Sequence, residues 1–145
     1  MPGKTLYERD FYGWSQEQAG LLRAGRAAEA DLENIAEEIE SMGKAERREL
    51  MNRLTVLLLH LIKWRFQPMM RGRSWRLSIR GQRLDIRDLL DQNPSLKPFL
   101  TQSIEQAWPR ALIEAERETG LDESAFPGSC PWSAEAILDD AFWPD

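Results

Sequence analysis

The feature that most constrains the fold is an apolar stretch, residues 54–62, that only Thr55 and His60 interrupt. It is too short for a membrane-spanning helix, which takes roughly 18 or more apolar residues. Apolar side chains at helical spacing extend the pattern on both sides: Leu50, Leu54, Leu57, Leu58, Leu61 and Trp64. This period predicts a helix over about residues 44–66. Because apolar residues cover most of its surface, we expect it to be the central helix of the fold.

The same period and the capping residues predict further helices around the central one. They are expected at residues 10–24, with Asp10 as N-cap; from about Asp31 to Gly43, which ends or kinks the helix; at 74–90, with Ser74 as N-cap; at 94–119, with Gly120 as the stop; and at 133–138. Pro68 prevents the central helix from continuing. We therefore expect an all-α, compact single-domain helical bundle of about five main helices over residues 1–145. Its aromatic and proline-rich tail, residues 125–145, is expected to pack on the bundle.

The composition excludes several classes of site. With 42% apolar and 30% charged residues, the chain resembles ordinary folded proteins. A single cysteine excludes an intramolecular disulfide, and with only one histidine it also excludes a Cys/His-cluster zinc site within one chain. No apolar run is long enough to cross a membrane, and the N-terminus lacks the apolar core of a signal peptide. We therefore expect a cytoplasmic protein that makes no contact with a membrane.

The net charge of −5 is the sum of three blocks of opposite sign. Residues 1–50 carry 7 basic and 11 acidic side chains, residues 51–100 carry 10 and 3, and residues 101–145 carry 2 and 10. Such asymmetry indicates one of two arrangements. Either the basic segment lies against acidic segments of the same fold, or it offers a basic surface to an acidic partner.

The basic block contains a stripe of five arginines at steps of 3, 4, 3 and 4: Arg73, Arg76, Arg80, Arg83 and Arg87. This spacing places them on one face of the fourth helix. Only Arg87 has an acidic residue three or four places away, so the stripe needs carboxylates from elsewhere. One source is a ladder of matching spacing on the second helix, Glu33, Glu37 and Glu40, because arginine pairs with carboxylates in a directional, bidentate way. Another is the acidic part of the tail: Glu135, Asp139 and Asp140.

The candidate binding surface is the junction of the third and fourth helices, where aromatic residues alternate with basic ones. It comprises Lys63, Arg65, Arg71, Arg73, Trp75, Arg76 and Arg80. We expect a non-enzymatic interaction module that presents this surface to an acidic protein partner. An alternative is binding of a nucleic-acid backbone, for which basic charge with interleaved aromatic rings is typical, although the acidic chain as a whole argues against it. An enzyme without a recognised motif is the third hypothesis, and the oligomeric state is open.

The candidates for metal and catalytic chemistry are weaker. Di-metal sites in helical bundles use Glu-x-x-His on two helices, and no such tetrad occurs here, so we expect no metal and no cofactor. His60 lies at the edge of the central apolar stripe and is expected to be a buried, hydrogen-bonded structural residue. Cys130 and His60 as nucleophile and base form a weaker hypothesis, since a cysteine before Pro131 fits a turn equally well. No catalytic residue is assigned.

Several segments carry a family resemblance when they are taken together in chain order: LYERDFYGWSQEQAGLLRAG, DLENIAEEIESMG, LLLHLIKWRFQP, RSWRLSIRGQR, NPSLKPFL, ETGL, and FPGSCPW followed by AILDDAFWP. With these segments the chain resembles the Domain of Unknown Function 29 family of bacterial proteins over almost its whole length. The resemblance implies an all-helical single domain, and it supplies no activity and no catalytic residues. The chain departs from the family pattern at Gly81 and Pro109.

Overall fold

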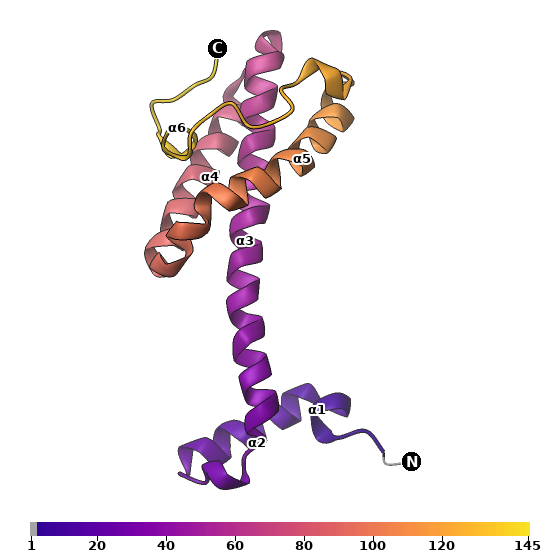
Figure 1. Cartoon of the computed structure of the whole chain (residues 1–145), viewed down its shortest axis with the longest axis vertical. Coiled ribbons are helices and arrows are strands. Elements are labelled where there is room, and N and C mark those ends of the chain that lie inside the picture. Colours follow the sequence, from indigo (N-terminus) through magenta and orange to yellow (C-terminus); the bar gives the residue numbers. More distant parts are fainter. Residues whose placement is uncertain (1–2) are drawn as a thin grey trace. The chain divides into compact units, whose positions relative to one another are not determined.

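The computed structural model describes residues 3–145, and every regular element within this range is helical (Figure 1). The α-helices are α1 (Leu6–Arg9), α2 (Phe11–Arg23), α3 (Leu32–Phe66), α4 (Arg73–Gln92), α5 (Leu100–Thr119) and α6 (Ala134–Leu138). Short 3-10 helices connect them: η1 (Ala27–Glu29), η2 (Pro68–Met70), η3 (Pro94–Phe99) and η4 (Glu123–Ala125). The all-α prediction is confirmed, and α2 to α5 are the long helices of the described chain.

The chain divides into two compact units, one ending at Ala45 and one comprising Glu46–Asp145. The N-terminal unit is organised around Trp14, whose ring nitrogen donates a hydrogen bond to a carboxylate oxygen of Asp31 at 3.0 Å. The backbone N–H of Asp31 donates in turn to Gln18 Oε1 at 2.6 Å, and the Tyr7 hydroxyl donates to Glu38. These bonds fix the start of α3 against α1 and α2. That residues 1–145 form a single domain stays a prediction.

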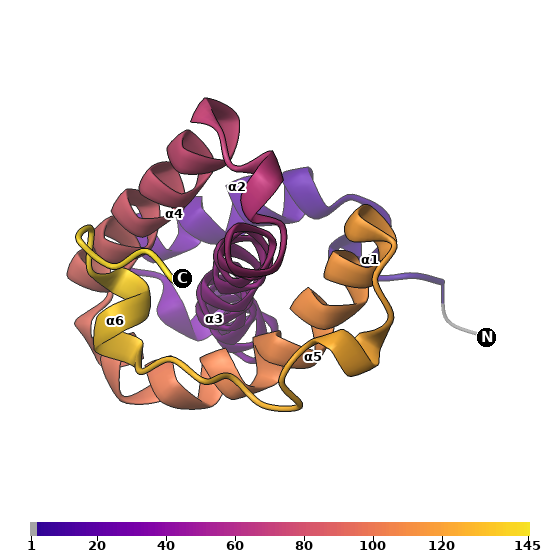
Figure 2. The ribbon, with the colours of Figure 1, turned by 90° about the horizontal axis from the view of Figure 1, so that it is seen from above.

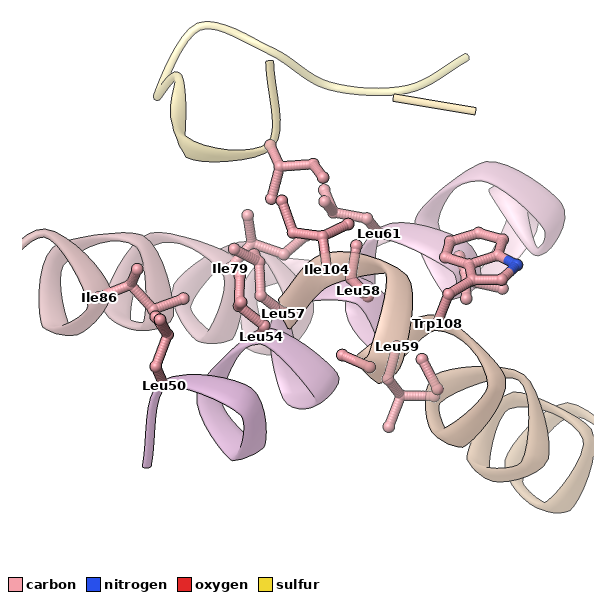
Figure 3. Close-up of a cluster of buried hydrophobic side chains, with 14 of the residues drawn as sticks. Leu50, Leu54, Leu57, Leu58, Leu59, Leu61, Ile79, Ile86, Ile104 and Trp108 are labelled. Atoms are coloured by element: carbon pink, nitrogen blue, oxygen red, sulfur yellow. The ribbon is translucent and has the colours of Figure 1, made fainter. Parts of the chain in front are cut away.

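In the C-terminal unit, the second half of α3 is the central element. Figure 2 looks along this helix and shows α4 and α5 on different sides of it. The leucines predicted for its apolar stripe are fully buried. Ile79 and Ile86 from α4 and Ile104 and Trp108 from α5 are buried with them (Figure 3). The prediction of a central helix buried on most sides is therefore confirmed for this half of α3.

The two helices predicted on either side of Gly43 are one helix of 35 residues, so the predicted end at Gly43 was wrong. Glycine inside a helix costs only about 1 kcal/mol relative to alanine. Gly43 also lacks the positive φ of a terminating glycine, in contrast to Gly120, which ends α5 with a φ of 75°. Helix α4 begins at Arg73, one residue before the predicted start, and Gly72 occupies its N-cap in place of Ser74.

The C-terminal tail packs on the body of this unit, as predicted. Three of its aromatic rings lie against rings of the long helices, with centroid distances of 5.3 Å for Phe126 and Phe66, 5.7 Å for Trp132 and Trp108, and 4.7 Å for Trp143 and Trp64. Helix α6 lies against α4 and α5, and its Ile137 is fully buried. Aromatic and aliphatic burial of this kind offsets the entropy of ordering a segment with little regular structure.

Candidate binding surface on helix α4

The arginines of the stripe on α4 have two roles: some hold the tail and others face solvent. Arg83 belongs to the first group and is the most buried of the five. Its side chain is completely buried, with Nε donating to the carbonyl oxygen of Ile137 at 2.7 Å and Nη2 donating to that of Phe142 at 2.8 Å. The guanidinium also lies 5.5 Å from the ring centre of Trp143. Burial lowers the pKa of Arg83, and the nearby carboxylates of Asp140 and Asp139 act in the opposite direction. Arg83 therefore holds the tail through backbone oxygens and is absent from the surface.

Two further arginines bind the tail. Arg87 forms a bidentate pair with Asp140, with nitrogen–oxygen distances of 3.0 and 3.1 Å, and also donates to the carbonyl oxygen of Leu138. Its hydrogen bonds lower the pKa of Asp140. Arg71 donates to the carbonyl oxygens of Trp64 at 2.7 Å and Pro144 at 3.3 Å. The prediction that an acid of the tail reaches the stripe is confirmed at Asp140.

The remaining arginines of the stripe are exposed and form the candidate surface. Arg73, Arg76 and Arg80 make no side-chain hydrogen bond or ion pair with any residue in the part of the chain that the structure describes. Beside them on the helix lie Leu77, 48% exposed, and Leu84, 53% exposed. Gly81 leaves an open hollow of about 390 Å³ beside the two leucines. We refer to this surface as the arginine–leucine face: Arg73, Arg76, Leu77, Arg80, Gly81 and Leu84.

The other members of the predicted surface are only partly available. Lys63 pairs with Glu118 at 3.0 Å, and its ammonium group lies 4.8 Å from the ring centre of half-buried Trp75. Arg71 is bound to the tail, whereas Arg65 is exposed above Phe66 at 5.3 Å. The aromatic rings between these basic residues face internal partners. The available part of the predicted surface is therefore mainly basic and aliphatic.

Sequence reasoning missed two exposed methionines that lie shortly before α4 in the chain. Met69 is 94% exposed and Met70 is 64% exposed, both in η2 between α3 and α4. Scattered exposed apolar side chains are common on protein surfaces. The signal in the sequence was the pair of methionines directly after Pro68, between Arg65 and Arg71.

His60 and Cys130 show structural contacts. His60 Nδ1 lies 2.8 Å from the carbonyl oxygen of Val56, and burial lowers the pKa of the half-buried ring. The Cys130 thiol lies 3.5 Å from the carbonyl oxygen of Trp132, and burial raises its pKa, which disfavours the thiolate that a nucleophile requires. The predicted hydrogen bond of His60 is confirmed, but the ring is half-buried and not buried as predicted. Among residues 3–145, no group of three histidine, cysteine or acidic side chains is placed to hold a metal ion.

The glutamates proposed as internal partners of the stripe belong to the N-terminal unit. Glu33, Glu37 and Glu40 are exposed on α3, and no ion pair to them occurs within the described range. Their pairing with the arginine stripe stays a prediction.

Comparison with known proteins matches the chain to a protein family. The family model described as a domain of unknown function, DUF29, matches residues 6–143, nearly the whole chain. No curated protein and no solved structure matches the chain. None of the helices in the described range combines the length and apolar composition needed to cross a membrane.

Proposed function

The chain belongs to the DUF29 family, a domain of unknown function, and from its surface we propose a non-enzymatic interaction module that binds an acidic protein partner through the arginine–leucine face. We expect it to act in the bacterial cytoplasm, where a lone cysteine without a disulfide is ordinary. The proposal keeps three of the basic residues predicted from the sequence, Arg73, Arg76 and Arg80. It assigns Arg71 to the tail and Lys63 to its pair with Glu118.

The observation that carries this proposal is the contrast within one stripe. Arg83 and Arg87 donate hydrogen bonds to the tail, whereas Arg76 and Arg80 on the same helix are exposed and have no partner among residues 3–145. Neighbouring arginines at helical spacing repel one another. A carboxylate-bearing partner relieves this repulsion and matches the planar, bidentate donor pattern of the guanidinium group.

The shape of the face favours a helical segment as the partner. Its charged and apolar residues recur at steps of three and four from Arg73 to Leu84, a length of about 16 Å at the rise of an α-helix. The exposed leucines and the hollow beside Gly81 supply an apolar contact next to the charges. An amphipathic helix that carries glutamates beside apolar side chains matches this arrangement, as in other helix-in-groove complexes.

A nucleic-acid backbone is the second candidate, because three adjacent unpaired arginines also suit phosphates. Base stacking, however, needs exposed aromatic faces. Trp64 packs on Trp143, Phe66 packs on Phe126, and the cation of Lys63 lies over Trp75. The rings that suggested nucleic-acid binding in the sequence are thus occupied, and this favours the protein partner.

The test measures binding of a fluorescent, amphipathic helical peptide with glutamates and leucines at helical spacing. A length of about 20 residues is suitable, since shorter peptides are marginally helical. Fluorescence anisotropy is recorded with the wild type, with Arg76→Glu and with Arg110→Glu, a control at an exposed arginine of α5. A single-stranded oligonucleotide is titrated in parallel.

We expect the wild type and Arg110→Glu to bind the peptide, and Arg76→Glu to bind it at least about tenfold more weakly, because like charges then face one another. Equal affinity of the wild type and Arg76→Glu for the peptide would refute the proposal. Tight binding of the oligonucleotide that is lost in Arg76→Glu, without peptide binding, would support the nucleic-acid alternative instead.

A further inference from the structure

The first half of α3 carries a face of the opposite charge to the arginine–leucine face. Its exposed apolar side chains are Leu32, Ile39 and Met42, with exposed fractions of 54%, 62% and 68%. Beside them lie three exposed glutamates without ion pairs in the described range: Glu33, Glu37 and Glu40. We call these six residues the glutamate–leucine face. Large apolar residues in a row beside unpaired charges are typical of a docking surface.

The two faces correspond in spacing as well as in charge. Leu32 and Ile39 are seven residues apart, as are Leu77 and Leu84. The outer glutamates, Glu33 and Glu40, and the outer arginines, Arg73 and Arg80, are also seven residues apart. Seven residues of helix span about 10.5 Å, so charges and apolar side chains repeat with the same period on both faces.

The order of charged and apolar residues around the two helices also favours contact between the two faces. At 3.6 residues per turn, the glutamates of α3 follow Leu32 and Ile39 in the direction in which the helix winds. On α4 the order is reversed, because Leu77 and Leu84 follow the arginines in that direction. When two helices face each other in parallel, opposite orders bring charge to charge and apolar residue to apolar residue.

We propose that the acidic partner of the arginine–leucine face is the glutamate–leucine face of a second copy of this chain. The proposal rests on the function proposed above and names the partner. In the proposed association two copies bind reciprocally, so that the arginine–leucine face of each meets the glutamate–leucine face of the other and the assembly is a dimer. Each contact joins glutamates to arginines and covers the exposed leucines of both helices, which supplies apolar burial in addition to electrostatic complementarity.

The experiment measures the mass of the full chain by light scattering coupled to gel filtration, over a range of protein concentrations and at low and high salt. Two charge-reversed variants are prepared, Arg76→Glu/Arg80→Glu and Glu37→Arg/Glu40→Arg. Arg110→Glu is the control. All of these residues are exposed, so circular dichroism should show unchanged helix content.

We expect the wild type and the control to reach twice the mass of one 16.8 kDa chain. Each reversed variant alone should dissociate at least about tenfold more readily, since like charges meet at both contacts. An equimolar mixture of the two variants should regain the dimer, because each reversed face then meets its complement. Recovery in the mixture separates a direct contact from a general loss of stability.

A wild type that stays monomeric at all concentrations would overturn the inference, as would reversed variants that dimerise like the wild type. Failure of the inference is distinguished from failure of the proposed function by the acidic peptide. A monomeric wild type that binds the peptide through Arg76 leaves the proposed function standing and excludes the second copy as partner. A monomeric wild type that does not bind the peptide refutes both.

Discussion

Replacing Arg83 by methionine removes the guanidinium that joins α4 to the tail while retaining a long apolar side chain. In the wild type this group donates to the carbonyl oxygens of Ile137 and Phe142 and lies over the ring of Trp143. The variant leaves both oxygens without these donors in a region where Arg83 itself is completely buried. The tail should therefore detach more easily from the body of the C-terminal unit.

The expected loss of stability follows from these contacts. A hydrogen bond from a charged donor contributes about 1.5–3 kcal/mol, so two give about 3–6 kcal/mol. Part of this is offset because methionine does not carry the cost of burying a charge, and we expect a net loss of about 2–4 kcal/mol. With an m-value of about 2 kcal/mol/M in urea, the unfolding midpoint should fall by about 1–2 M.

The assay is urea unfolding of the wild type, Arg83→Met and Arg110→Met, followed by circular dichroism and by tryptophan fluorescence. Arg110→Met makes the same chemical change at an exposed position of α5, outside the arginine–leucine face, and should stay within about 0.5 kcal/mol of the wild type. If Arg83→Met and Arg110→Met have the same midpoint, the assignment of Arg83 as the anchor of the tail is refuted.

Three further predictions concern the tail, α4 and the N-terminal unit. Deleting residues 126–145 should lower the melting temperature and increase binding of a hydrophobic dye, because the buried Phe126 and Ile137 are lost and the surfaces beneath them become exposed. An unchanged melting temperature would show that the tail is dispensable for stability. Gly81→Ala should raise stability in urea by about 0.5–1 kcal/mol, since alanine is the better helix former and nothing beyond the neighbouring backbone of the same helix lies within 4 Å of the added carbon; a lower midpoint would contradict this. The hydrogen bond to Glu38 raises the pKa of Tyr7 from 10.0 to about 12, so its contribution to stability is present below pH 10 and is lost as the pH rises towards 12. The absorbance titration of tyrosinate, compared with that of Tyr7→Phe, should show this late ionisation, and a titration of Tyr7 near pH 10 would be inconsistent with the bond.

The helices were predictable from the sequence because their signals are local. Each signal affects only its own turn of helix or the neighbouring ones, as with the leucine stripe of residues 50–61, the helix-breaking Pro68 and the helix-ending Gly120. Gly43 misled the prediction because its helix penalty is small, and the flanking turns outweigh it. Whether a single glycine ends a helix depends on the free energy of the whole segment, which the residue alone does not reveal.

The division of the arginine stripe was not predictable from side-chain patterns. Arg83 and Arg80 occupy equivalent positions in the repeat, yet the partners of Arg83 are backbone oxygens more than 50 residues away. Every residue has such an oxygen, so the sequence contains no signal for it. Trp75 misled in a similar way, because its position among basic residues does not show that Lys63 covers its ring.

The most direct measurement of the division between anchoring and available arginines is nuclear magnetic resonance of their side-chain Nε–H groups. In the Glu37→Arg/Glu40→Arg variant, whose arginine–leucine face is not covered by a second copy, the Nε–H of Arg83 should exchange slowly with solvent, because it is buried and bonded to Ile137, while that of Arg80 should exchange rapidly. Adding the acidic peptide should shift the signals of Arg76 and Arg80 and leave Arg83 unchanged. Rapid exchange at Arg83, or a peptide that binds without shifting Arg76 and Arg80, would contradict the account.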